Sequence, residues 1–387
     1  MKYTTFFLLI ALMFFCPQEK LYAGKNTDID SLLSLLPKAD ETEKLRLFNE
    51  IAEQYIPQNP DKSYEYAQKA LKNARAQNNK IAEADALNNM GKVWYFKRSK
   101  TKAVNYFNQS YDLSEKIQYT KGKAKALTNL ALLNKIDKNY ENAAEYLLRA
   151  IDENKKLEDM EEMARLSNDL ASVFYHSDKR EKALEYYNKA LQINKELNHI
   201  AEIAISYNRI GKIHYSWSDY KTAIANYEKA LKIWQNEDNK EQTASVLINI
   251  GLCYQNQGDF DRAFTHFQQA LSIAQKGDYR ELIGQAFDKI AQIHSAWGKY
   301  QKALEYFDKA LELHKQNNND EAYLWTLGNI ATTYKYQNKY DKALQKYKEV
   351  LKEHKKNLDY KDKIATTLAN IGEIYVYINE PENAIAY

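Results

Sequence analysis

Three series of small residues recur along this chain with a period of 40 positions. The first series is Ala103, Ala143, Ala183, Ala223, Ala263, Ala303 and Ala343. The second is Gly91, Ala131, Ala171, Gly211, Gly251, Ala291 and Ala331, with Gly372 one residue late. The third is Ala70, Ser110, Ala150, Ala190, Ala230, Ala270 and Ala310, ending with Val350. A strict period between about 20 and 50 residues is the signature of a solenoid, in which each repeat packs only against its neighbours.

Within one repeat the apolar residues have helical spacing. A representative unit carries Leu247, Ile250, Gly251, Tyr254, Phe260, Ala263, Phe267 and Ala270. The first four fall at i, i+3, i+4 and i+7, which places one small residue in the middle of an apolar stripe. Between the two groups, Gly258 is suited to end one helix and Asp259 to cap the next. Each repeat is therefore predicted to be an antiparallel pair of helices.

These eight positions resemble the tetratricopeptide repeat pattern of large, aliphatic, small, aromatic, aromatic, small, aromatic and small residues. The resemblance runs from about residue 41 to the end of the chain. It departs from the family in two ways, because the period is 40 instead of 34 and the usual Pro after the second helix is absent. The resemblance implies an all-α fold, a right-handed alpha-alpha superhelix (solenoid) of antiparallel helix-pair repeats.

The N-terminus has the pattern of a secretory signal. Lys2 precedes a short apolar run over residues 6–15, which is shorter than the roughly 20 residues needed to span a bilayer. Ala23 is suited to the cleavage position, and Phe14 and Phe15 before Cys16 disfavour a lipid-attachment site. We therefore expect a signal peptide over residues 1–23 and export to the periplasm or the medium. Cleavage would leave Cys253 as the one thiol of the mature chain.

The expected domains are a lead-in over residues 24–40 and a repeat array over residues 41–387, with about eight repeats and a truncated ninth. The ninth repeat begins at Glu380-Pro381 and stops within its second helix. An incomplete repeat leaves the apolar face of its neighbour uncovered, which suggests a piece of a longer protein. No second apolar run follows the N-terminal one, so no membrane span is expected within this chain.

The candidate binding residues lie two positions before the second small series, on the stripe expected to line the inner wall of the superhelix. They are Asn89, Asn129, Arg209, Asn249, Lys289, Asn329 and Asn370. Asn is a poor choice for a helix interior, but its amide offers both a donor and an acceptor to an extended peptide. In relatives with long repeats, an Asn ladder at this position resembles the element that grips a bound peptide. The alternative is that these amides join neighbouring helices or are solvated.

Charged and aromatic residues extend the same wall. The cations are Lys92, Lys125, Arg165 and Lys212 beside Arg209 and Lys289, with Asp85 and Asp169 opposing them. A basic wall favours a partner that carries carboxylates, whereas the alternative is a solvated face without a role. Trp325, Tyr336 and Tyr377 are placed to anchor a partner side chain or to pack against an adjacent repeat.

Nothing in the sequence indicates catalysis or a bound cofactor. Lys and Arg number 55 against 52 Asp and Glu, so the net charge of +3 gives no reason to expect nucleic acid as a partner. His214 and His294 occupy an aromatic core position, and the other five His residues lack the spacing of metal ligands. A phosphate loop and a nucleophile elbow are absent. An enzyme would need a site made by the short loops at the repeat edges, and no such site is visible.

The sequence therefore predicts an exported scaffold that binds a peptide or protein segment in the concave groove. The alternative is the extracytoplasmic sensing region of a longer membrane signalling protein, a histidine kinase or a DNA-binding regulator, truncated at residue 387. Glu41-Thr42-Glu43-Lys44 and the Asn59-Pro60-Asp61-Lys62 helix start resemble arrays that precede such output modules.

Overall fold

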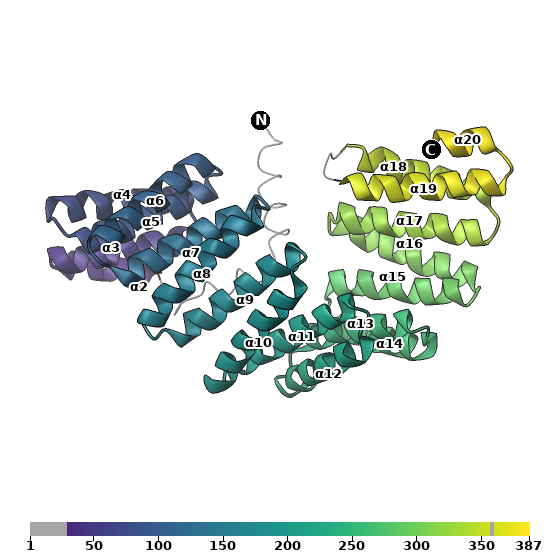
Figure 1. The fold of residues 1–387 in the computed structure, drawn as a ribbon, viewed down its shortest axis with the longest axis horizontal. Coiled ribbons are helices and arrows are strands. Elements are labelled where there is room, and N and C mark those ends of the chain that lie inside the picture. The colour runs from purple at the N-terminus through teal and green to yellow at the C-terminus, as the bar shows by residue number, and fades with distance from the viewer. Residues whose placement is uncertain (1–28, 357–359) are drawn as a thin grey trace. The chain divides into compact units, whose positions relative to one another are not determined.

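The computed structural model describes residues 29–356 and 360–387, and within these ranges the chain is all-α without a strand. The predicted signal peptide, with Cys16, lies outside the described residues. Figure 1 shows consecutive helices that run back and forth as pairs. The pairing confirms the predicted solenoid of antiparallel helix-pair repeats.

Each repeat contributes one first helix and one second helix. The first helices are α3 (Glu41–Tyr55), α5 (Lys80–Phe96), α7 (Thr120–Ile136), α9 (Met160–His176), α11 (Ile200–Ser216), α13 (Lys240–Asn256), α15 (Arg280–Ala296), α17 (Asp320–Tyr336) and α19 (Lys361–Tyr377). The second helices are α4 (Pro60–Ala76), α6 (Lys100–Lys116), α8 (Tyr140–Lys156), α10 (Arg180–Glu196), α12 (Tyr220–Asn236), α14 (Phe260–Lys276), α16 (Tyr300–Gln316), α18 (Tyr340–His354) and α20 (Pro381–Ala386). Before them, α2 (Ile29–Leu35) and the 3₁₀ helix η2 (Leu36–Lys38) belong to the predicted lead-in, and Leu32 of α2 packs on α3.

Two compact units divide the chain, Met1–Ser206 and Tyr207–Tyr387. Consecutive helices contact each other from α3 to α10 in the first unit and from α12 to α20 in the second. Successive first helices also contact each other, as α3 and α7 contact α5 in the first unit and α13 and α17 contact α15 in the second. The first helices α3, α5 and α7, and likewise α13, α15 and α17, thus form rows on the face where the sequence places the candidate binding residues.

The turns within and between repeats have one recurring geometry. In the representative repeat, Gly258 adopts a left-handed backbone with φ of 79° and ends α13. Asp259 then caps α14, because its Oδ1 accepts the backbone N–H of Arg262 at 3.0 Å. This cap satisfies one of the four N–H groups that a helix start leaves without a partner. The predicted roles of Gly258 and Asp259 are therefore confirmed.

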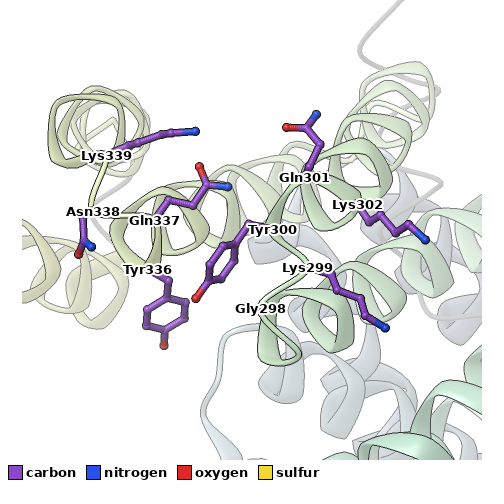
Figure 2. A pocket seen from close by; sticks show the side chains of 9 residues that line it. All are labelled: Gly298, Lys299, Tyr300, Gln301, Lys302, Tyr336, Gln337, Asn338 and Lys339. Carbon is purple, nitrogen blue, oxygen red and sulfur yellow. The ribbon is translucent and has the colours of Figure 1, made fainter.

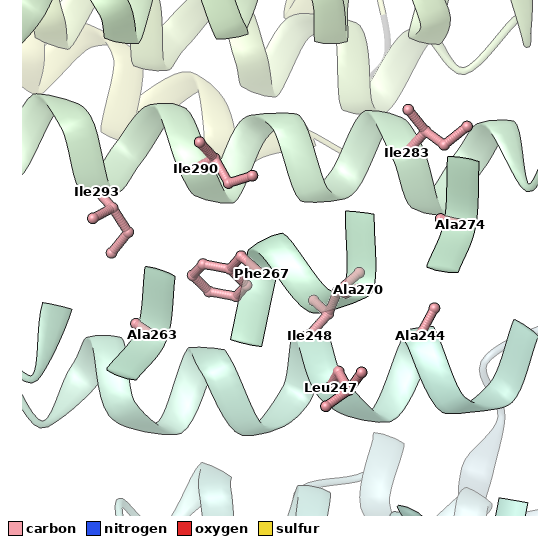
Figure 3. Packing of buried hydrophobic residues seen from close by; sticks show 10 residues of the cluster. All are labelled: Ala244, Leu247, Ile248, Ala263, Phe267, Ala270, Ala274, Ile283, Ile290 and Ile293. Carbon is pink, nitrogen blue, oxygen red and sulfur yellow. The ribbon is translucent and has the colours of Figure 1, made fainter. Parts of the chain in front are cut away.

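The small residues form the seam along which paired helices approach each other. Ala263 and Ala270 of α14 are fully buried between α13 and α15, as Figure 3 shows. Phe267 of the same helix lies against Gly251 so closely that a Cβ atom at Gly251 would sit 2.5 Å from the ring. A large side chain at this position cannot be accommodated without displacing the ring.

In many of the helix pairs, a cation at the start of the second helix contacts an aromatic ring near the end of the first helix. The contacts place the cation 3.9 Å from the ring centroid for Lys102 and Trp94, 4.5 Å for Arg262 and Tyr254, 5.5 Å for Lys182 and Phe174, and 5.6 Å for Lys342 and Tyr334. In each case the aromatic residue ends the first helix and the cation, eight positions later, begins the second. Each exposed contact of this kind contributes about 0.5–1 kcal/mol. The contacts give a structural use to part of the chain's 31 Tyr residues.

No helix among the described residues combines the length and the apolar character that crossing a bilayer requires.

Two glycines of the second unit give opposite predictions for stability. We expect Gly251→Leu to lower the free energy of unfolding by about 1–3 kcal/mol, because the new side chain overlaps the Phe267 ring. We expect Gly328→Ala to raise it by up to about 1 kcal/mol, because nothing lies within 4 Å of its Cβ position and Ala favours the helix. Urea unfolding followed by circular dichroism measures both. Equal midpoints for the two variants would contradict the seam as described.

Candidate functional site

Three of the predicted binding Asn residues hold neighbouring repeats together. The bonds are Asn89 Nδ2 to Asn49 O (3.0 Å), Asn129 Nδ2 to Asn88 Oδ1 (3.0 Å) and Asn249 Nδ2 to Asn208 Oδ1 (3.0 Å). Asn89 and Asn129 are also only 4% and 7% exposed. The structure therefore gives these amide N–H groups the structural use that the sequence left open as an alternative, and binding by them stays a prediction.

The predicted cations of the first unit's wall are mostly paired with carboxylates. Lys92 Nζ lies 2.6 Å from a Glu53 oxygen, and Lys125 Nζ lies 3.3 Å from Asp85. Arg165 on α9 bonds Asp169 one turn later at 2.9 Å. These cations are neutralised locally, so the expectation of a basic wall for an acidic partner is weaker in this unit.

Arg209 on α11 and Asn370 on α19 are each half-buried.

In the second unit, the amides of Gln255, Gln292 and Asn329 form what we call the amide row. Their Oε1, Nε2 and Nδ2 atoms, respectively, are buried without a hydrogen-bond partner. The residues lie on α13, α15 and α17 at intervals of 37, three fewer than the repeat. Each step to the next first helix thus moves about 4.5 Å toward its N-terminus. The row crosses the first helices diagonally.

The two glutamines of the amide row are complementary to a peptide group. Gln255 Nε2 donates to Gln292 Oε1 at 3.1 Å, which leaves one C=O and one NH₂ group without their bonds. Exchanging N and O in both amides leaves the same pair of groups, so this result does not depend on how the amides are oriented. A buried polar group without a partner costs about 1–3 kcal/mol. A chain that supplies one N–H and one C=O would recover this cost.

An aromatic side chain stands beside the amide row. Trp325 is 46% exposed and precedes Asn329 by four residues, so the two share one face of α17. Lys289 of α15 lies under the indole ring, with Nζ 4.3 Å from its centroid. Burial lowers the pKa of Lys289, and the neighbouring Asp288 charge opposes this shift. Lys289 and Asn329, both predicted site residues, thus lie on the first-helix face with Trp325 and the glutamines.

A buried polar network fixes the helices behind this face, and sequence reasoning missed it. Asp288 is 3% exposed and accepts from Thr326 Oγ1 at 2.7 Å, while its other oxygen lies 2.8 Å from His314 Nε2. The network joins α15, α16 and α17. The sequence does carry a signal, because Asp288 is acidic at a first-helix position that other repeats fill with uncharged residues such as Asn88, Thr128 and Ile248. A buried carboxylate requires such partners.

The remaining predicted wall aromatics are exposed but not free of neighbours. Tyr336 and Tyr377 are 56% and 57% exposed. Tyr377 stacks on Tyr340 with ring centroids 6.0 Å apart. Lys335 Nζ lies 5.8 Å from the Tyr336 ring and 2.8 Å from a Glu373 oxygen. Tyr377 thus packs against an adjacent repeat as one alternative expected, and anchoring of a partner side chain by these rings stays a prediction.

The two histidines at the predicted aromatic core position, His214 and His294, pack against aromatic rings. His294 is 7% exposed and lies among Phe264, Trp297 and Tyr306, which confirms its predicted core position. His214 contacts Trp217 edge-on and hydrogen-bonds Asp219 at 3.1 Å. No group of three potential metal ligands comes together in the part of the chain that the structure describes.

The repeats match a known family model. The model described as "Tetratricopeptide repeat" matches residues 122–196, 202–276 and 282–356, which together exceed half of the chain. A comparison with the sequences of curated proteins finds no match.

Solved structures share the architecture at low sequence identity. Aspartyl phosphate phosphatase F from Bacillus subtilis is 16% identical, with a TM-score of 0.62 over 90% of this chain and 93% of that chain. The apo quorum sensor NprR from B. thuringiensis is 15% identical, with a TM-score of 0.62 over 90% and 97% of the two chains. A Rap protein complexed with competence and sporulation factor is 15% identical, with a TM-score of 0.52 over 88% and 99%. At these identities the likeness shows the fold alone.

Asn249 and Asn329 occupy equivalent repeat positions, but only the Asn249 amide N–H bonds a neighbouring repeat. Asn249→Ala removes the donor to Asn208, whereas Asn329→Ala removes a buried N–H group that has no partner. Both substitutions replace Asn by Ala and so gain the same helix propensity. The lost hydrogen bond to Asn208 is therefore the expected difference between the stabilities of the two variants. We expect Asn249→Ala to be less stable than Asn329→Ala by about 1 kcal/mol in urea unfolding. The reverse order would contradict this assignment.

Proposed function

Because the chain belongs to the tetratricopeptide repeat family, we propose that it is a scaffold that binds an extended segment of another protein. The binding surface in this proposal is the first-helix face of the second unit, defined by Gln255, Lys289, Gln292, Trp325 and Asn329. The segment would cross α13, α15 and α17 along the amide row.

The amide row carries the proposal. Folded proteins pair nearly all of their buried polar groups, so three unpartnered amide atoms on successive helices require an explanation. An extended chain presents N–H and C=O groups along its length, and small rotations of the three side chains would aim the amides at them. Trp325 beside the row has the size and exposure of an anchor for one partner side chain.

The structural neighbours support a partner of this kind. One of them is a Rap protein in complex with competence and sporulation factor, so a similar fold accommodates a bound factor. Another is called an aspartyl phosphate phosphatase, but at 16% identity that name carries no activity over to this chain. We therefore propose binding, and not catalysis, as the role of the array.

Export is part of the proposal and rests on the leader pattern of residues 1–23 alone. An exported scaffold would meet its partner in the periplasm or outside the cell.

Selection from a displayed library of random 15-residue peptides tests the binding face. We expect the wild-type chain to enrich a family of peptides, and Gln292→Ala with Asn329→Ala to bind them at least tenfold more weakly. The lost bonds to the peptide backbone supply this difference, since about 1.4 kcal/mol corresponds to a factor of ten. Fluorescence anisotropy with a selected peptide gives the dissociation constants.

The matched control is Gln268→Ala with Gln269→Ala, which removes two exposed amides from the second helix α14. We expect this variant to keep wild-type affinity. Equal binding by the face variant and the wild type, with both folded, would refute the proposed face.

The leader can be tested by expressing the full chain in a bacterium and sequencing the exported product. We expect the mature N-terminus to be Gly24. The denatured product should then react with one equivalent of a thiol reagent, because only Cys253 remains. In the folded product this thiol should stay unreactive, since it is fully buried and burial raises its pKa to about 12. An intact N-terminus and two thiols in the cell fraction would contradict export.

A further inference from the structure

Two histidines of the second unit are buried without an acceptor at Nδ1. His294 of α15 and His354 of α18 are 7% and 8% exposed, and within the described part of the chain each Nδ1 atom is buried without a hydrogen-bond partner. In an imidazolium ion both ring nitrogens are donors, so Nδ1 would then require an acceptor. His314, the third buried histidine of this unit, differs, because its Nε2 atom lies 2.8 Å from Asp288. Protonation of His294 or His354 would place a charge among the helices without such compensation.

Aromatic rings enclose His294 from the helices on either side. Phe264 of α14 and Tyr306 of α16 each have a ring centroid 5.5 Å from that of the imidazole. Trp297, which follows α15, lies 5.6 Å away. These rings exclude water from His294 and supply no carboxylate.

The charged groups beside His294 are two lysines. Figure 2 shows Lys299 and Lys302 extending to the same side of α16, away from the turn between α17 and α18. Lys299 Nζ lies 4.7 Å from the Trp297 ring centroid. Burial lowers the pKa of His294, and the charges of both lysines lower it further.

His354 lies at the contact between α18 and α19. Tyr360 meets its ring edge-on, with centroids 5.5 Å apart. The charged groups that face it are Lys363 of α19 and Glu321 of α17, which form an ion pair with each other. Burial lowers the pKa of His354, Lys363 acts in the same direction, and Glu321 opposes both. The one nearby carboxylate is therefore already occupied by a lysine.

These two neutral histidines make the second unit less stable in mild acid. The ordinary pKa of a histidine is 6.5, so below pH 6.5 the unfolded chain takes up protons at both positions before the folded chain does. Their contribution to stability is therefore complete above pH 6.5 and is lost as the pH falls below it. Glu65 and Glu373 accept hydrogen bonds from lysines that lower their pKa below 4.5, so these carboxylates act only in stronger acid.

The two histidines support the helices that carry the amide row. His294 follows Gln292 by two residues on α15. His354 lies on α18, which packs against α17, the helix of Trp325 and Asn329. We propose that mild acid loosens the contacts of α15 with α16 and of α18 with α19, and so releases the protein segment held on the first-helix face. This inference rests on the proposed function and adds its regulation.

Melting temperatures of the full chain at pH 7.5 and pH 5.5, followed by circular dichroism, test the acid sensitivity. The test variant is His294→Tyr with His354→Asn. Adjacent repeats carry Tyr254 and Tyr334 at the first position, and an earlier repeat carries Asn194 at the second, so the fold accepts these residues there. We expect the melting temperature of the wild type to fall on acidification, and that of the test variant to fall by about half as much or less.

The matched control is His199→Asn with His266→Asn, which removes two half-buried histidines outside these two contacts. We expect the control to respond to acid as the wild type does. Equal falls in the wild type, the test variant and the control would overturn the proposal.

Titration of the histidine rings in the wild-type chain by NMR gives a check that does not depend on how well the double variant folds. Signals of His294 and His354, assigned with the single variants, should titrate with midpoints below pH 6.5. Midpoints at or above pH 6.5 for both rings would equally overturn the proposal.

Fluorescence anisotropy with a selected peptide that lacks His, Asp and Glu tests the release. We expect the wild type to bind this peptide at least about fivefold more weakly at pH 5.5 than at pH 7.5, and the test variant less than about twofold more weakly. Equal wild-type affinity at both pH values would refute the release and leave the first-helix face valid. Failure to select any peptide would refute the proposed function and the release with it, whereas the melting temperatures would still decide the acid sensitivity.

Discussion

The close approach of paired helices at small residues is the constraint on which the rest of the structure depends. Where Gly251 stands, the Phe267 ring occupies the space that a side chain would fill. Because the same contact recurs every 40 residues, each pair presents the next one with an equivalent apolar surface, and the first helices are brought side by side. Any surface that spans several repeats inherits its spacing from this seam.

The fold was readable from the sequence because its determinants are local and repeated. A small residue such as Ala263 indicates a buried contact, Gly258 indicates a helix end and Asp259 indicates a helix start. The same residue types recur at the same positions of other repeats. The short helix α2, which packs Leu32 onto α3, was not foreseen, since it belongs to no repeat and its apolar residues form only two turns.

The candidate site was readable only in part. The repeat phase correctly brought Lys289 and Asn329 to the first-helix face, but it could not distinguish amides that bond a neighbouring repeat from amides that do not. For Asn249 and Asn329 that difference depends on the residue 41 positions earlier, which is Asn208 and Asp288, respectively. Asp288 is itself occupied by Thr326 and His314, so Asn329 is left without an acceptor. Gln292 occupies the repeat position of Lys92 and Lys212 on the predicted wall, but its pairing with Gln255 was not foreseen, because the two become neighbours only through the 37-residue diagonal.

The diagonal of Gln255, Gln292 and Asn329 would also fix the spacing of the contacts along a segment bound on it. Neighbouring helix axes are about 8–10 Å apart, and an extended chain advances about 3.3 Å per residue. Each repeat along the row would therefore correspond to about three residues of a bound strand. Because successive side chains of a strand point to opposite faces, a side chain on the same face would meet an equivalent environment only after two repeats, or about six residues. If a segment binds on the proposed face in this way, a single-residue insertion in it would shift all later contacts out of phase.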